Sequence, residues 1–139
     1  MIVRGAIVAG LLLALQTPAA MGCGHCVEDK IAAVYDHALI TRTLSTSHQV
    51  VFFHIEGARA PGRATRRGLE AIAESVEGVD RGSVRVSLES ASLAVAFDPR
   101  RASLAAVHKA LEKKLAGKKL SLVILRVMDS PAELKTVGR

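Results

Sequence analysis

Cys23 and Cys26 are the residues of this chain whose type and spacing best suit a chemical role. They are the two cysteines among 139 residues, and they stand in the stretch M-G-C-G-H-C-V at residues 21–27. An amphipathic pattern follows this stretch directly, so Cys26 is predicted to open a helix. The unpaired backbone amides and the dipole at a helix start favour a thiolate over a thiol. We therefore expect thiolate chemistry at this pair.

Metal binding is the first reading of the pair. Cys23 and Cys26 can hold Cu(I) between two soft sulfur ligands, with His25 as a third candidate ligand. Zn(II) is less expected, because a closed zinc site takes four ligands and would need histidines from elsewhere or a second chain. On this reading the protein is a carrier or sensor of a soft, copper-type metal ion. Its partners are the ion and a protein to which it transfers the ion, and no enzyme activity is expected.

Three alternatives stay open for the same residues. Cys-Gly-His-Cys resembles the active-site tetrapeptide of protein disulfide isomerases, which suggests a thiol-disulfide redox protein. The pair also suits a structural disulfide, which an oxidising compartment would allow. The third alternative is an interaction module that binds no metal. Covalent haem attachment is not expected, because it requires a histidine directly after the second cysteine, where Val27 stands.

The first 22 residues read as a signal peptide. Arg4 precedes an apolar run at residues 6–15, and small residues follow. That run is about ten residues long, against about 20 for a transmembrane helix. Cleavage after Ala19 or after Gly22 fits equally well, and lipidation of Cys23 is a third option. We expect an exported protein, periplasmic or secreted, that meets a membrane only through this segment or a lipid anchor.

Net charge and aromatic content limit the classes of binding partner that we expect. The formal net charge is +6, which attracts anionic partners in general, but the chain has no Trp, one Tyr and three Phe. Nucleic-acid binding is not expected, because single-stranded binding depends on aromatic stacking groups. The remaining histidines have no ligand-like spacing, and we expect ordinary histidines at His48, His54 and His108.

Four segments are predicted along the chain. Residues 1–22 form the signal peptide, residues 23–48 the cysteine pair with one amphipathic helix and a linker, residues 49–128 a folded domain, and residues 129–139 a polar tail. The helix is expected to run without a break over residues 27–44, which would place His37 about 16 Å from Cys26 at about 1.5 Å per residue. On that geometry His37 cannot join the cysteine site.

The domain at residues 49–128 follows the order strand, helix, strand, strand, helix, strand. The first and last strands are predicted from apolar runs at residues 50–55 and 120–127, and the middle two from alternating apolar residues between 84 and 97. The two helices are predicted from apolar residues at helical spacing, and Ser103 is predicted to cap the second. This order is the split βαβ unit. It predicts a ferredoxin-like α+β fold, a βαββαβ sandwich with both helices on one face of an antiparallel sheet and an extra helix before it.

The domain resembles the heavy-metal-associated (HMA) family, whose members bind copper or other soft metals. The resemblance rests on Glu56-Gly57 after the first strand, Glu77-Gly78-Val79 after the first helix, the hairpin that ends in Asp98-Pro99, and the second helix. In that family two loop cysteines hold the metal. Here that loop is residues 57–63, and Ala60 and Arg63 stand where the cysteines would be. The resemblance therefore implies the fold without its usual metal site, and the pair at Cys23 and Cys26 looks like that motif displaced upstream.

Overall fold

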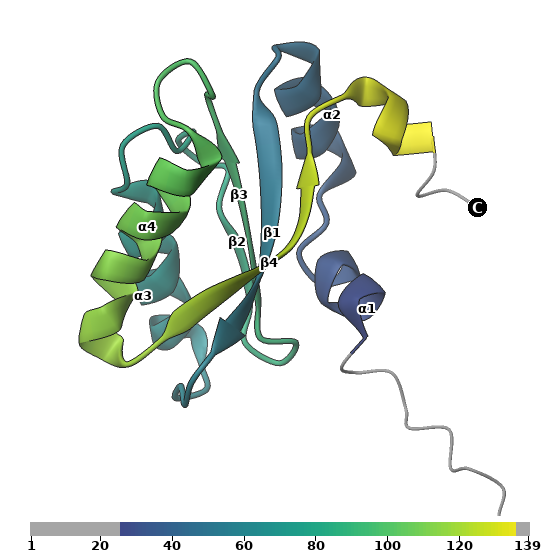
Figure 1. Cartoon of the computed structure of the whole chain (residues 1–139). Coiled ribbons are helices and arrows are strands. Elements are labelled where there is room, and N and C mark those ends of the chain that lie inside the picture. The colour runs from purple at the N-terminus through teal and green to yellow at the C-terminus, as the bar shows by residue number, and fades with distance from the viewer. Residues whose placement is uncertain (1–25, 136–139) are drawn as a thin grey trace, which may run out of the picture.

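The computed structural model describes residues 26–135 as one sheet with helices on both of its faces (Figure 1). In chain order the elements are α1 (Val27–Ala32), α2 (His37–Ser45), β1 (Gln49–Glu56), α3 (Arg63–Glu74), β2 (Arg85–Ser87), β3 (Ser92–Phe97), α4 (Leu104–Leu115), η1 (Ala116–Lys118), β4 (Ser121–Met128) and η2 (Pro131–Lys135).

The sheet confirms the predicted ferredoxin-like α+β fold. Its strand order is β2-β3-β1-β4, and each neighbouring pair is antiparallel. The two central strands, β1 and β3, pair from Gln49↔Phe97 to His54↔Ser92. Helices α3 and α4 lie together on one face, as the split βαβ order requires. The Ser103 hydroxyl accepts a hydrogen bond from the Ala106 backbone N–H at 3.1 Å, so the predicted cap of α4 is confirmed.

Successive residues of β1 point to opposite faces of the sheet, and both faces are apolar. Val51, Phe53 and Ile55 belong to a buried cluster that includes residues of α3 and α4, which we call the α3/α4 cluster. Val50 and Phe52 belong to a second buried cluster with residues of α1 and α2, which we call the α1/α2 cluster. The sheet is therefore covered on both sides, and all six residues of β3 are buried.

One continuous helix was predicted over residues 27–44, and this prediction is wrong because the segment forms two helices, α1 and α2. The chain leaves helical geometry after α1, and Asp36 caps a new helix by accepting a hydrogen bond from the Leu39 N–H at 3.0 Å. Asp at this position is a strong helix start, since its side chain satisfies an otherwise unpaired amide. The break lets α1 and α2 each turn an apolar side to the sheet. It also removes the continuous helix on which the exclusion of His37 depended.

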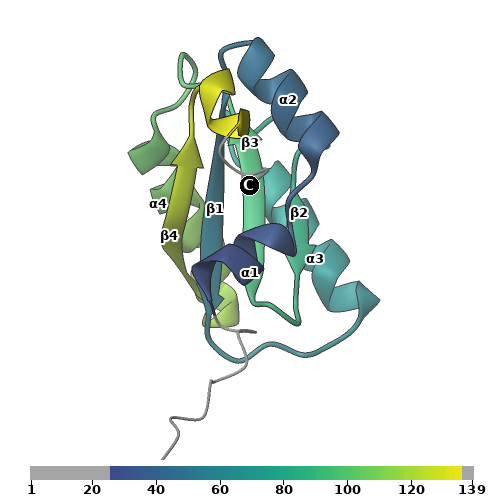
Figure 2. The ribbon, with the colours of Figure 1, turned by 90° about the vertical axis from the view of Figure 1, so that its right-hand side faces the viewer.

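The α1/α2 layer lies on the face opposite α3 and α4 (Figure 2). Ile31 and Val34 in or beside α1 and Ile40 and Leu44 in α2 are buried against this face. The short η2 helix lies beside α2, where Leu134 packs partly against the same cluster. Among the described residues, no helix has the length and the apolar character that crossing a bilayer would require.

Candidate metal centre

Cys26 begins α1 and is exposed. Its backbone carbonyl accepts the first helical hydrogen bond, from the Lys30 N–H at 3.1 Å, so the predicted position of Cys26 at a helix start is observed. Cys23 and His25, the other two predicted ligands, lie outside the described residues. The geometry of the cysteine pair is therefore still a prediction, and α1 is the element that would present it.

Contacts to three different strands or turns hold α1 against the sheet. Ile31 is buried in the α1/α2 cluster, and the Lys30 ammonium donates to the Ser90 carbonyl oxygen at 2.9 Å. The Arg126 guanidinium on β4 pairs with the Glu28 carboxylate, and this hydrogen bond lowers the pKa of Glu28. Lys30 is only 8% exposed, which is unusual for a lysine and marks a specific attachment. The start of α1 is thus a positioned element rather than a dangling segment.

The loop between β1 and α3 occupies the place where the resembled family carries its metal ligands. Gly57 opens it with φ of +111°, and a Cβ at this position would lie 2.6 Å from the Lys119 carbonyl oxygen. Only glycine fits there without strain. This contact explains the Glu56-Gly57 signal seen in the sequence.

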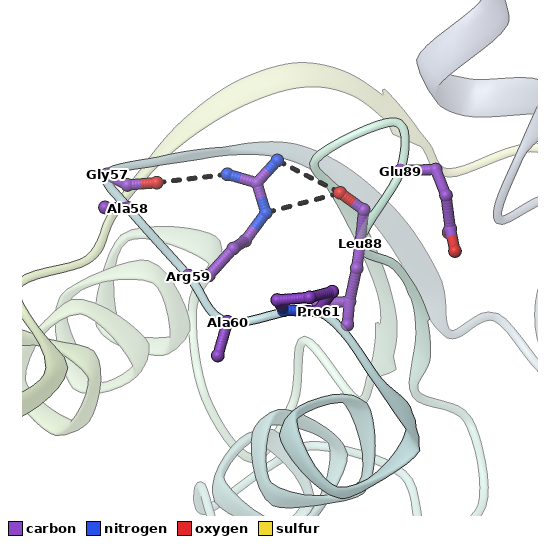
Figure 3. Close-up of a pocket in the computed structure, with 7 residues that line it drawn as sticks. All are labelled: Gly57, Ala58, Arg59, Ala60, Pro61, Leu88 and Glu89. Carbon is purple, nitrogen blue, oxygen red and sulfur yellow. Dashed lines mark hydrogen bonds between the residues drawn. The ribbon is translucent and has the colours of Figure 1, made fainter.

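The Arg59 side chain cross-links this loop to the turn between β2 and β3 (Figure 3). Its Nε and Nη2 donate to the Leu88 carbonyl oxygen at 3.3 and 3.0 Å, and its Nη1 donates to the Gly57 carbonyl oxygen at 3.0 Å. A cavity of about 380 Å³ lies beside it, lined by residues 57–61, Leu88 and Glu89. This lining contains neither sulfur nor imidazole, and it carries the fixed positive charge of Arg59. The loop therefore does not fit a soft metal cation.

Among residues 26–135, no three His, Cys, Asp or Glu side chains gather as a metal site would require. Within this part of the chain the exposed soft donor is the Cys26 sulfur, since the Met128 thioether is buried, and Cys26 lies at the start of α1, across the sheet from α3 and α4. A site at the cysteine pair would thus be independent of the loop at residues 57–63.

His48 belongs to a charged cluster that the sequence reading did not anticipate. Its Nδ1 lies 2.7 Å from Asp80 Oδ2, and its Nε2 lies 3.7 Å from Asp98 Oδ2. Arg100 binds the Asp98 carboxylate through Nε at 3.0 Å, and these hydrogen bonds lower the pKa of Asp98 and raise that of Arg100. The cluster joins the start of β1 to the ends of two distant segments. Spacing alone could not reveal it, because the contacts span 32 and 50 residues of chain.

His54 and His108 are half-buried histidines on opposite faces of the sheet. His54 Nδ1 lies 3.0 Å from the Ala91 carbonyl oxygen, on the face covered by α1. His108 on α4 places Nε2 2.9 Å from the Leu122 carbonyl oxygen, and Glu112 accepts from the Leu122 N–H at 2.8 Å. His108 and Glu112 thus satisfy the backbone N–H and C=O of Leu122 near the start of the edge strand β4, so this residue is not open to pairing with another chain.

Comparison with known proteins finds a likeness among solved structures and none among family models or curated proteins. Among solved structures, the crystal structure of oxidized MerP from Ralstonia metallidurans CH34 is similar at 23% sequence identity, covering 57% of this chain and 99% of that chain with a TM-score of 0.45. At this identity and TM-score, the likeness adds nothing to the fold already described.

Proposed function

We propose that this protein is an exported carrier or sensor of a soft metal ion, held by Cys23 and Cys26 with His25 as a further candidate ligand. The observation that carries the proposal is the position of Cys26, which is exposed at the start of a docked helix. The fold's own ligand loop has no soft donor, so the cysteine pair is the remaining candidate. Cu(I) is the preferred ion and Zn(II) the second choice.

The start of α1 suits a thiolate that must exchange its metal. The backbone amides of the first turn point toward Cys26, and their partial positive charge stabilises the negative sulfur. Glu28 in that turn would oppose this effect, but its carboxylate is paired with Arg126. Because Cys26 is exposed, a thiolate of a partner protein can reach a metal bound there. Metal transfer then proceeds by replacing one sulfur ligand with another, without an enzymatic step.

The test begins with mass spectrometry of the mature protein, which identifies its first residue. Anaerobic titration of the reduced mature protein with Cu(I) follows, with a Cys23→Ser, Cys26→Ser variant as its control. We expect one equivalent of Cu(I) to bind the wild-type protein and none to bind the variant with comparable affinity. A mature chain that starts after Cys26 would remove the proposal altogether.

The same protein preparation tests the redox alternative. The reduced wild-type protein and the Cys23→Ser, Cys26→Ser variant are each mixed with a substrate protein whose disulfides are scrambled. The rate at which the native substrate is recovered is then compared between the two. Metal carriage predicts copper uptake without cysteine-dependent reshuffling. Reshuffling in the absence of copper uptake would replace our proposal with a thiol-disulfide enzyme.

A further inference from the structure

Arg59 is a fixed cation whose contacts include no carboxylate. Its three hydrogen bonds all go to the neutral carbonyl oxygens of Gly57 and Leu88. No Asp or Glu side chain lies within ion-pair distance of it in the part of the chain that the structure describes. A guanidinium carries five N–H groups, so one N–H on each terminal nitrogen, Nη1 and Nη2, is left for a further acceptor. A carboxylate offers two oxygens to such a pair of donors.

The cavity beside Arg59 is lined mostly by apolar side chains. Ala58, Ala60, Pro61 and Leu88 contribute to it, and its volume of about 380 Å³ is that of a small-molecule site. Its lining has one acidic residue, Glu89, which is exposed and lies with Oε2 3.4 Å from the Ser87 hydroxyl. In Figure 3 the Glu89 side chain extends away from the guanidinium. The charge of Arg59 therefore borders the cavity without a neutralising partner.

A second cation borders the same loop. An adjoining hollow of about 240 Å³ shares Ala58, Arg59 and Ala60 with the first, and Lys118 of η1 also lines it. Lys118 is exposed and belongs to no ion pair among residues 26–135. No acidic residue lines this hollow. The two hollows together present two cations and one carboxylate, a balance that attracts an anion.

Pairing of the strands fixes Arg59 in place. β1 and β3 are antiparallel neighbours, so the loop that leaves β1 after Glu56 lies beside the turn that enters β3 at Ser92. Arg59 bridges this loop and this turn by donating to the Leu88 carbonyl oxygen. A guanidinium that is already held loses little conformational freedom when a ligand binds, and such preorganisation raises affinity.

We propose that this cavity binds a small organic carboxylate, with Arg59 donating to the carboxylate oxygens and the apolar lining contacting the carbon chain. A carboxylate fits better than sulfate or phosphate, because an apolar lining would leave the other oxygens of those ions without donors. The site lies in the loop where the resembled family holds a cation, and here it takes an anion. It is independent of the metal site proposed at Cys23 and Cys26, so either proposal can fail without the other.

The test is an NMR titration of the full chain with sodium butyrate, with sodium chloride keeping the ionic strength constant. Butyrate joins a carboxylate to a short apolar chain, and butyramide is its neutral counterpart. We expect the Arg59 Nε–H resonance to shift to saturation with butyrate, with a dissociation constant on the order of 1 mM, and to stay in place with butyramide. Sulfate should compete poorly. An equal response to butyramide or to sulfate would overturn the assignment of a carboxylate site.

Three variants separate charge, shape and general electrostatics, and backbone amide resonances of the loop and of Leu88 report binding in each. Arg59→Met should weaken butyrate binding by about tenfold or more, because it removes the charged donors. Ala60→Phe keeps Arg59 and fills the cavity, and it should weaken binding to a similar degree. Ala60 is exposed, so the larger side chain leaves the core of the domain undisturbed.

Arg67→Met is the matched control. It removes one positive charge from an exposed position of α3 that lies outside both linings, and it should change butyrate binding by no more than about twofold. Equal losses in Arg59→Met and Arg67→Met would reduce the binding to net charge and overturn the proposal. Unchanged butyrate binding in Arg59→Met would also overturn it.

Discussion

The two faces of the sheet are formed by the same strands, but they differ in the length of the helices that cover them and in the polar groups that they bury. The α3/α4 face is closed by two helices of twelve residues each over a cluster of apolar side chains, and its loop is tied down by Arg59. The α1/α2 face is covered by helices of six and nine residues. Beside the apolar residues it holds a buried lysine and a buried hydroxyl, Lys30 and Ser92. The face on which Cys26 lies therefore also buries polar groups.

The turn between β2 and β3 connects the two faces. Arg59 reaches the Leu88 carbonyl, Lys30 reaches the Ser90 carbonyl, and His54 reaches the Ala91 carbonyl. These three side chains come from the β1–α3 loop, from α1 and from β1. A change at this turn therefore affects both the loop at residues 57–63 and the helix that presents Cys26. The difference between the faces can be tested by disrupting the α1/α2 layer and the α3/α4 layer separately.

The largest effect is expected when the α1/α2 layer is removed. A chain that begins at residue 47 would expose Val50, Phe52 and Met128, which are now buried. A sheet with a large bare apolar face is prone to association. We expect the truncated domain to lose cooperative thermal unfolding and to bind a hydrophobic dye, whereas the longer chain does neither. A monomeric truncated domain with an unchanged melting curve would show that the second face is dispensable.

A large effect is expected from emptying either cluster. Phe52 and Phe53 are adjacent, both fully buried, and point to opposite faces. Each Phe→Ala change should lower the free energy of unfolding by about 3–5 kcal/mol. Hydrogen exchange separates them: Phe52→Ala should accelerate exchange mainly in α1 and α2, and Phe53→Ala in α3 and α4. Identical exchange patterns would mean that the two clusters unfold as one unit.

A smaller effect is expected from cutting the two side-chain ties to the β2–β3 turn. Lys30→Met and Arg59→Met keep the apolar stem and remove the donors to Ser90 and to Leu88. Each should reduce the free energy of unfolding in urea by about 1 kcal/mol, because water replaces part of the lost hydrogen bonding. Only Lys30→Met should also weaken Cu(I) binding, since it loosens α1. Weakened binding in Arg59→Met would return attention to the loop at residues 57–63.

The smallest effect is expected from acid. Hydrogen bonds from the Leu39 N–H and from Arg85 lower the pKa of Asp36 on the α1/α2 side, and Arg100 lowers that of Asp98. A carboxyl whose pKa is lower in the folded state stabilises the fold above its ordinary pKa of about 4 and loses this effect as the pH falls below it. The melting temperature should therefore decline below about pH 4. Asp36→Asn and Asp98→Asn should each flatten this decline, and an unaltered slope in both would exclude these carboxyls as its source.

Much of the fold was readable in the sequence, since local patterns specify local structure. A run of β-branched and aromatic residues predicted β1, alternating apolar residues predicted β3, the Ser103 cap predicted the start of α4, and the order of elements predicted the sheet. The break between α1 and α2 was not predicted, because apolar residues keep their helical spacing across Asp36. Asp is nevertheless a residue type that often caps the start of a helix, as Asp36 does here. Periodicity reports which side of a segment is apolar, and two short helices can share one period.

The sequence by itself determined which groups can bind a soft metal, because only cysteine supplies a thiolate and the loop at residues 57–63 has none. From the sequence, His54 was expected to be an ordinary histidine, because its spacing from other possible ligands is not ligand-like. Only the tertiary structure decided that α1 covers the face bearing His54 and Ser92, and that the Leu88 carbonyl holds Arg59 beside a cavity. The reason is physical: pairing between β1 and β3 and the docking of α1 bring together groups dozens of residues apart, and no local pattern encodes that contact.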